Sequence, residues 1–193
     1  MHEKLIKQAI DLFDTPEKWE AFGELYRRYN AIKMRGFREM RDELYREELA
    51  LQDPNWNVVK WNDWDIRWEL ATDGKRLWIH FWGDYLKIYV GYLDISKVQN
   101  LIMSNERFNR IRQVFNEHCR LDGFDNNTLA FERQSNIEYT FNNKTVIIKD
   151  SDELSWYVAH YPTEFKLQLL KKVRALQTPE MVELFKEIVE KCQ

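Results

Sequence analysis

The sequence predicts an α+β fold in which helices from both ends of the chain pack against an antiparallel sheet. Apolar residues recur at helical spacing near both ends of the 193-residue chain, whereas in residues 63–93 the period changes to two. The composition, with 44% apolar and 32% charged residues, is typical of a globular protein. We therefore expect one compact domain over residues 1–193, helical in 1–50, sheet-rich in 56–149 and helical in 151–192.

The first fifty residues predict two helices separated by a break. Thr15, Pro16 and Glu17 form a start signal for the second helix. Thr15 can accept hydrogen bonds from free amides, Pro16 suits the first helical position, and Glu17 faces the positive end of the helix dipole. One broad apolar stripe follows, and it fits both a helix that continues to about residue 50 and one that kinks at Gly36. The stripe consists of Trp19, Phe22, Leu25, Tyr26, Tyr29, Ile32, Phe37, Met40 and Leu44.

The side of this helix opposite the stripe is basic. On a continuous helix its five arginines share one side, which is a geometry that suits a phosphate backbone. They are Arg27, Arg28, Arg35, Arg38 and Arg41. A solvated face that neutralises itself is the alternative we favour, because opposite charges recur at a spacing of four. The pairs are Glu24–Arg28, Arg35–Glu39 and Arg38–Asp42.

Residues 63–93 predict a three-stranded antiparallel meander. Asp73–Gly74 and Gly83–Asp84 are two-residue turn signals, and together they determine how the three strands pair. Every row on one face is then apolar, and a slip of one residue in either hairpin would destroy the match. This face, which we expect the helices to cover, carries Ile66, Trp68, Leu70, Leu77, Ile79, Phe81, Leu86, Ile88 and Val90.

The same pairing places large aromatic and charged residues on the other face, in three rows across the strands. These rows are Asp65, Trp82, Tyr85; Arg67, His80, Lys87; and Glu69, Trp78, Tyr89. Such a surface can be covered by the protein's own helices, can anchor a protein partner, or can stack bases or sugars. Internal packing is the most common of these uses.

Six of the eight tryptophans fall between Trp56 and Trp82, and the pairing divides them. Trp64 and Trp68 go to the apolar face, whereas Trp78 and Trp82 go to the opposite face. Trp56 and Trp61 precede the meander in a stretch that alternates poorly. This stretch predicts either a short edge strand or an aromatic loop that closes the end of the sheet.

The second half of the chain returns to helix and then to strand. Residues 94–103 and 105–118 predict two short helices, and residues 129–149 predict a further strand and a hairpin around Asn142–Asn143 that extends the same sheet. Helices follow from residue 151 onward. Thr178–Pro179–Glu180 repeats the start signal seen near the N-terminus.

No catalytic motif emerges from the residues. Four histidines and two cysteines are too scattered for a zinc site, and the six glycines are too isolated for a phosphate loop. The most enzyme-like pattern is Asp63, Asp65 and Glu69 alternating along one strand beside His80 and Lys87, as in a metal-dependent nuclease or hydrolase. Polar alternation of this kind is also the ordinary exposed face of a sheet, so we expect no cofactor and no metal, and a non-enzymatic role is favoured.

These observations favour a non-catalytic, cytoplasmic protein-binding module, for instance an inhibitor or immunity-type protein. The chain shows no pattern of a secretory signal and no apolar run of the roughly 18 to 20 residues that span a bilayer. The expected partner is a protein, nucleic acid being the alternative through the arginines, and the oligomeric state is left open. The expected binding residues are Asp65, Arg67, Glu69, Trp78, His80, Trp82, Tyr85, Lys87 and Tyr89.

Overall fold

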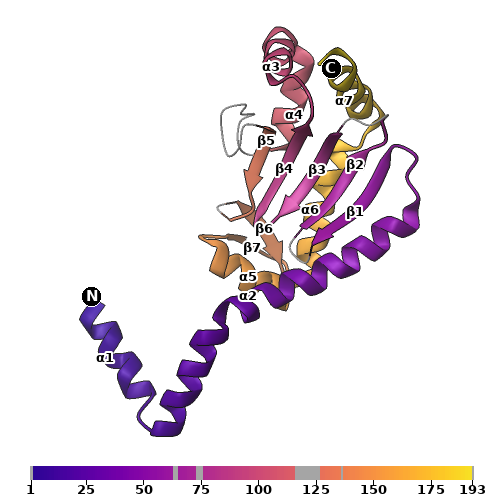
Figure 1. The fold of residues 1–193 in the computed structure, drawn as a ribbon. Helices are drawn as coiled ribbons and strands as arrows, with labels where there is room; N and C mark the ends of the chain where they lie inside the picture. The colour runs from indigo at the N-terminus through magenta and orange to yellow at the C-terminus, as the bar shows by residue number, and fades with distance from the viewer. Residues whose placement is uncertain (1, 63–64, 73–75, 116–126, 136, 193) are drawn as a thin grey trace. The chain divides into compact units, whose positions relative to one another are not determined.

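The computed structural model describes residues 2–62, 65–72, 76–115, 127–135 and 137–192 (Figure 1). The chain divides into two compact units, Met1–Arg35 and Gly36–Gln193. The Asp73–Gly74 turn, Asp63 and the orientation of Trp64 lie outside the described residues.

The first unit is helical. It contains α1, His2–Leu12, and the first part of α2, Pro16–Leu51. Thr15 precedes α2 as the start signal predicts, and its Oγ1 accepts a hydrogen bond from the amide of Lys18 at 3.3 Å. The rings of Phe13 and Phe22 lie with centroids 4.5 Å apart, so the turn between the helices packs on α2.

In the second unit, α2 passes through Gly36 as a continuous helix. A Cβ atom on Gly36 would lie 2.9 Å from the Cα of Ala159 in α5, Ser151–His160. Glycine at this position therefore serves the close approach of two helices. From here on the apolar stripe of α2 is buried, at Phe37, Met40 and Leu44.

Five antiparallel strands form the main sheet in the order of the sequence. Their bounds are β1 Trp56–Asn62, β2 Asp65–Leu70, β3 Arg76–Trp82, β4 Tyr85–Gly91 and β5 Thr128–Arg133. β1 resolves the alternative left open at Trp56 and Trp61, because it is an edge strand paired with β2. Its pairing shifts between Val59 and Asn62, and this irregularity explains the poor alternation.

The pairing predicted for the meander is confirmed. Ile79 pairs with Trp68 on one side and with Ile88 on the other, and the neighbouring rows agree. Gly83 adopts a φ of +59° in the turn between β3 and β4, a conformation that favours glycine. The faces of the sheet are therefore those expected from the alternation of side chains.

Helices from both ends of the chain cover the apolar face, which we call the core face. Besides α2, they are α6, Pro162–Leu176, and α7, Pro179–Lys191. Phe81 of the sheet packs against Phe37 of α2 at 6.3 Å and against Phe165 of α6 at 6.1 Å, and Trp56 packs against Phe185 of α7 at 6.1 Å. In Figure 1 α6 passes behind the strands, so the view is onto the opposite face.

The second predicted hairpin forms, but it does not extend the main sheet. β6, Glu138–Phe141, and β7, Lys144–Ile147, make a separate two-stranded sheet, whereas β5 alone joins β4. Asn142 and Asn143, at φ of +48° and +58°, make its turn. After β5, the amide of Gln134 donates to the carbonyl of Asp84 in the turn between β3 and β4 at 2.6 Å.

Shorter helices complete the second unit. They are α3 Ile95–Ser104, the 3₁₀ helix η1 Glu106–Phe108 and α4 Asn109–Val114. Thr178 caps α7 as predicted, and its Oγ1 accepts from the amide of Met181 at 3.4 Å. The rings of Tyr139 and Phe165 lie 5.3 Å apart and join the separate hairpin to α6.

Candidate functional site

The nine residues predicted to bind a partner lie together on the face of the sheet opposite the core face, which we call the aromatic face. β2, β3 and β4 each contribute three residues at alternate positions. The pairs Asp65–Trp82, Arg67–His80 and Glu69–Trp78 join β2 to β3, and the pairs Trp82–Tyr85, His80–Lys87 and Trp78–Tyr89 join β3 to β4. All three predicted rows are thus present, on the strands labelled β2, β3 and β4 in Figure 1.

A buried polar cluster occupies the middle of the aromatic face. Asp65 Oδ2 lies 3.1 Å from His80 Nε2 and 3.3 Å from a terminal nitrogen of Arg67. Burial lowers the pKa of His80 below its ordinary value, although the hydrogen bond to Asp65 acts in the opposite direction. His80 Nε2 also lies 3.4 Å from Nε of Arg67, so the three side chains contact one another in one buried cluster.

Aromatic rings cover the two cations of the aromatic face. The guanidinium carbon of Arg67 lies 4.7 Å from the ring centroid of Trp61 and 5.4 Å from that of Trp78. Trp78 in turn stacks on Tyr89 at 4.6 Å, while Lys87 Nζ lies 5.1 Å from the Tyr89 ring. Cations and rings therefore alternate across four strands, a geometry in which each contact stabilises its neighbours.

The three tryptophans of this face differ in how much of their surface is exposed. Trp61 and Trp82 keep 62% and 41% of their surfaces exposed, whereas Trp78 is buried together with Asp65, His80 and Lys87. The prediction treated Trp78 and Trp82 as equivalent, but only Trp82 has a ring available for contact. Trp61 is the functional candidate that the sequence reasoning left unplaced, and an irregular edge strand beside Arg67 is the feature that brings it to this face.

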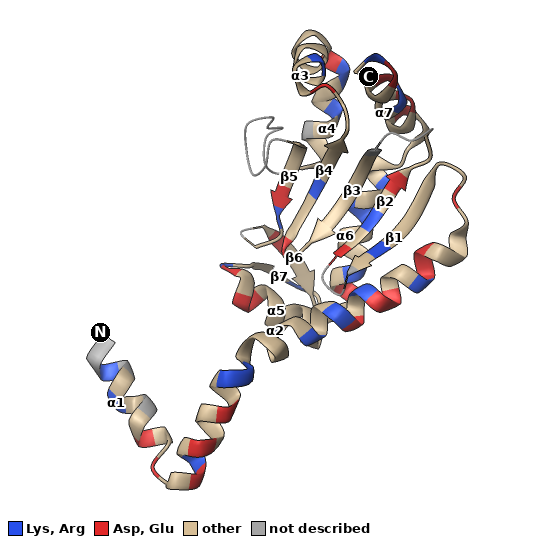
Figure 2. Cartoon of the chain, in the orientation of Figure 1, with Lys and Arg blue, Asp and Glu red and all other residues tan. Residues whose placement is uncertain are grey.

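One of the five arginines predicted to share an exposed face of α2, Arg41, is not exposed. Arg41 is buried, because α2 lies on the core face there, and it cannot share an exposed side with Arg27, Arg28, Arg35 and Arg38. Arg27 and Arg28 both form ion pairs with Glu24, as the self-pairing alternative predicts for Arg28. Figure 2 shows acidic residues among the basic ones along α2.

Arg41 has a structural position. Its guanidinium carbon lies 5.1 Å from the ring of Phe37 and 4.9 Å from that of Phe81, and a terminal nitrogen donates to the carbonyl of Gly83 at 2.7 Å. Burial lowers the pKa of Arg41 to about 10. Its other two nitrogens have no hydrogen-bond partner among the residues that the structure describes. The side chain ties α2 to the turn between β3 and β4.

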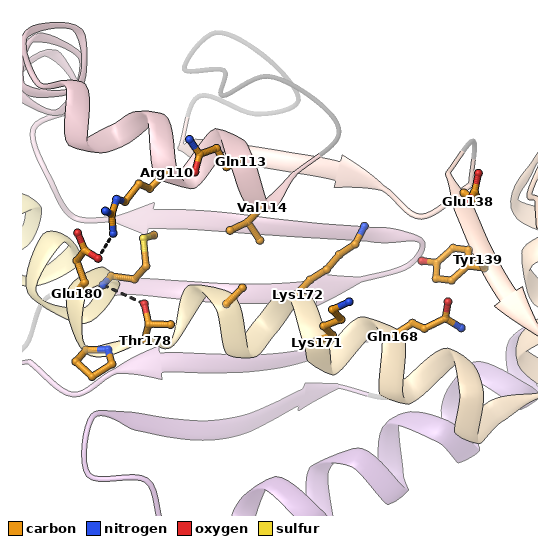
Figure 3. A pocket seen from close by; sticks show the side chains of 13 residues that line it. Arg110, Gln113, Val114, Glu138, Tyr139, Gln168, Lys171, Lys172, Thr178 and Glu180 are labelled. Carbon is orange, nitrogen blue, oxygen red and sulfur yellow. Dashed lines mark hydrogen bonds and ion pairs between the residues drawn. The ribbon is translucent and has the colours of Figure 1, made fainter.

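A cavity of about 960 Å³ lies between α4, α6, the start of α7 and β6 (Figure 3). Of its three cations, Arg110 pairs with Glu180 and Lys172 pairs with Glu132, which is fully buried, while Lys171 is exposed. Gln134 Nε2 donates to Glu132 at 3.2 Å, and the Tyr139 hydroxyl donates to Gln134. Burial raises the pKa of Tyr139 well above its ordinary value. These contacts hold α6 to β5 and β6, and the wall of the cavity offers no convergent reactive groups.

The metal-dependent nuclease alternative finds no site in the described part of the chain. Among these residues, no three histidines, cysteines or acids come together as metal ligands. Asp63 lies outside the described residues, and Asp65 contacts His80 and Arg67. Glu69 is half-buried at the opposite end of β2.

Comparisons with protein-family models, with curated proteins and with solved structures gave no match for this chain. None of the helices in its described ranges is both long enough and apolar enough to cross a membrane.

Proposed function

We propose that the protein is a non-catalytic binding protein, of the inhibitor or immunity type, that holds a protein partner on its aromatic face. The observation that carries the proposal is the exposure of two tryptophans, Trp61 and Trp82, on a face whose central groups, Asp65, Trp78, His80 and Lys87, are buried. Tryptophan and arginine are the residues that most often dominate protein interfaces. Rings that are held rigidly before binding lose little conformational entropy when a partner arrives.

The chemistry of the face favours a protein over a nucleic acid. Arg67 lies between two indole rings and contacts Asp65, and Lys87 is buried beside Tyr89. A phosphate group needs cations that can turn toward it, and these two are held inside the surface. The partner that suits this face is a protein segment of low charge that places an aliphatic or aromatic side chain against the exposed indoles.

The pair Asp65–His80 in the buried polar cluster supports a structural role in holding the aromatic face better than it supports a catalytic role. His80 is buried and its Nε2 is directed at Asp65, so the imidazole is used within the cluster. The arginines of α2 support the nucleic-acid alternative less well than the face supports a protein, because Arg41 is buried and Glu24 neutralises Arg27 and Arg28.

The test compares partner capture by three forms of the full chain. The first is the wild-type protein, and the second carries Trp61→Ala and Trp82→Ala together. The third is a matched control, Trp156→Ala, which removes a half-exposed tryptophan from α5. Proteins of the native cell that bind the immobilised wild-type chain are identified, purified and titrated against all three forms.

We expect at least one purified partner to bind the wild-type and Trp156→Ala forms alike. The double variant should bind it about 100-fold more weakly, since two interface tryptophans are lost. Thermal unfolding by circular dichroism verifies that the double variant is folded. Equal binding of the partner by all three forms would contradict the proposal. Capture of no cellular protein by the wild-type chain would also contradict it.

A further inference from the structure

The helical unit, residues 1–35, carries an apolar surface that its own two helices leave open. The stripe of α2 that is buried beyond Gly36 is exposed throughout this unit, and α1 adds two further members. We call this surface the apolar stripe. It comprises Ile6, Ile10, Trp19, Phe22, Leu25, Tyr26, Tyr29 and Ile32.

The spacing within α2 is that of a helix that packs on another helix. Trp19, Phe22, Tyr26 and Tyr29 follow one another at intervals of three, four and three residues, the a and d positions of a heptad. Leu25 and the aliphatic residues near it widen the seam on one side. A helix with so wide an apolar face is normally buried by more than one neighbour.

The rings of the stripe contact one another within the unit. Phe13 and Trp19 lie 6.4 Å apart, Trp19 and Phe22 lie 5.9 Å apart, and Phe22 and Tyr26 lie 6.4 Å apart. The column of rings is therefore formed before any second surface arrives. A preformed surface of this kind loses little entropy on association.

The size of the stripe matches what a stable dimer requires. Each aromatic side chain presents roughly 100 Å², half of its total surface, and the aliphatic members add similar amounts. The sum is about 800 Å². The largest apolar patch of a typical monomer is about 300 to 600 Å². A standard protein interface takes about 800 Å² from each partner.

The charged residues of this part of α2 lie away from the seam. Glu17, Glu20 and Glu24, and after them Arg27, Arg28 and Arg35, fall at positions of the heptad other than a, d, e and g. Two such stripes can therefore pack on each other without burying a charge between them.

We infer that the apolar stripe is a self-association surface, on which α2 of one copy of this chain packs against α2 of a second copy. In an antiparallel pair, a two-fold axis near residue 24 brings Trp19 of one copy to Tyr29 of the other and Phe22 to Tyr26. The inference does not depend on a partner at the aromatic face, because different residues carry it.

The first experiment measures the oligomeric state of the full chain by sedimentation velocity over a range of about 1,000-fold in concentration. The test variant carries Leu25→Ser and Ile32→Ser in the stripe. The control carries Leu167→Ser and Ile147→Ser, which remove the same residue types from exposed positions of the second unit; Leu25 and Leu167 are 57% and 60% exposed.

We expect the wild-type chain and the control to form dimers, and the stripe variant to be monomeric or to dimerise about 100-fold more weakly. If the wild-type chain is monomeric at every concentration, the inference is overturned. The stripe would then be covered by other parts of the same chain or would remain exposed to solvent. Binding to vesicles of anionic lipid by a monomeric chain would overturn it in favour of a membrane surface.

The second experiment locates the contact and its direction with spin labels. Ala21 and Ala31 are replaced in turn by labelled cysteine in a chain that carries Cys119→Ser, while Cys192 is buried. At a rise of 1.5 Å per residue, an antiparallel pair with its axis at residue 24 separates the two copies of the label along the helix by roughly 9 Å at position 21 and roughly 21 Å at position 31. A parallel pair on the same stripe gives equal, short separations at both positions. A dimer whose labels lie too far apart to interact at both positions would contradict the inference.

Discussion

The two faces of the main sheet are built from the same three strands but are buried by different means. The core face is apolar in every row and is covered by α2, α6 and α7. On the aromatic face, the buried groups are an ionic cluster with rings packed over it. The core face is held mainly by packing between apolar side chains, whereas the interior of the aromatic face depends on the contacts of Asp65 with its cationic and imidazole partners. The two faces should therefore fail in different ways.

The largest effect is expected on the core face, from Phe81→Ala. Phe81 is fully buried and packs against Phe37, Phe165 and Arg41, so the substitution leaves a cavity among three elements. We expect the free energy of unfolding to fall by about 3 to 5 kcal/mol. Urea unfolding followed by tryptophan fluorescence measures it. A loss below about 1 kcal/mol would show that α2 and α6 do not meet over this ring.

The core face is also the part of the fold that the sequence predicts best. Its apolar rows alternate strictly, and Gly83 and the paired asparagines mark turns whose backbone few other residues adopt. Local signals of this kind also place the caps at Thr15 and Thr178. They require no knowledge of tertiary contacts.

Tertiary contacts decided what the sequence could not. The two parts of α2 have the same apolar spacing, yet the stripe is buried at Phe37 and exposed at Phe22, because only the second unit supplies strands and helices against it. The same cause buries Arg41 and leaves Arg38 exposed. On the aromatic face, alternation placed Trp78 and Trp82 together, but neighbours on adjacent strands cover only Trp78.

A smaller effect is expected from Asp65→Asn on the aromatic face. The amide keeps the shape of the carboxylate but removes the charge that Arg67 and His80 contact, and Lys87 is buried nearby. We expect a loss of about 2 to 3 kcal/mol in the free energy of unfolding, because buried cations lose their counter-charge. Glu69→Gln, on the same strand and face but only half-buried, is the control and should change stability little.

The same variant should shift the titration of His80, measured by NMR. Because Asp65 raises the pKa of His80 against the effect of burial, Asp65→Asn should lower that pKa further. The folded chain already binds a proton at His80 less readily than the unfolded chain, so this group makes stability fall as the pH drops below about 6.5. The variant should extend that loss to lower pH. A raised pKa would show that Asp65 does not contact the imidazole.

The smallest effect is expected from Trp82→Ala, and it distinguishes the rim of the aromatic face from its interior. Trp82 is partly exposed and lies 5.5 Å from Lys87 Nζ, so its removal should cost about 1 kcal/mol of unfolding free energy. Trp78, four positions before Trp82 on β3, is buried and stacked on Tyr89, so Trp78→Ala should cost about 3 kcal/mol. Equal losses in the two variants would mean that both rings belong to the interior. Trp82 would then be unavailable to a partner, and the aromatic face would differ from the core face only in composition.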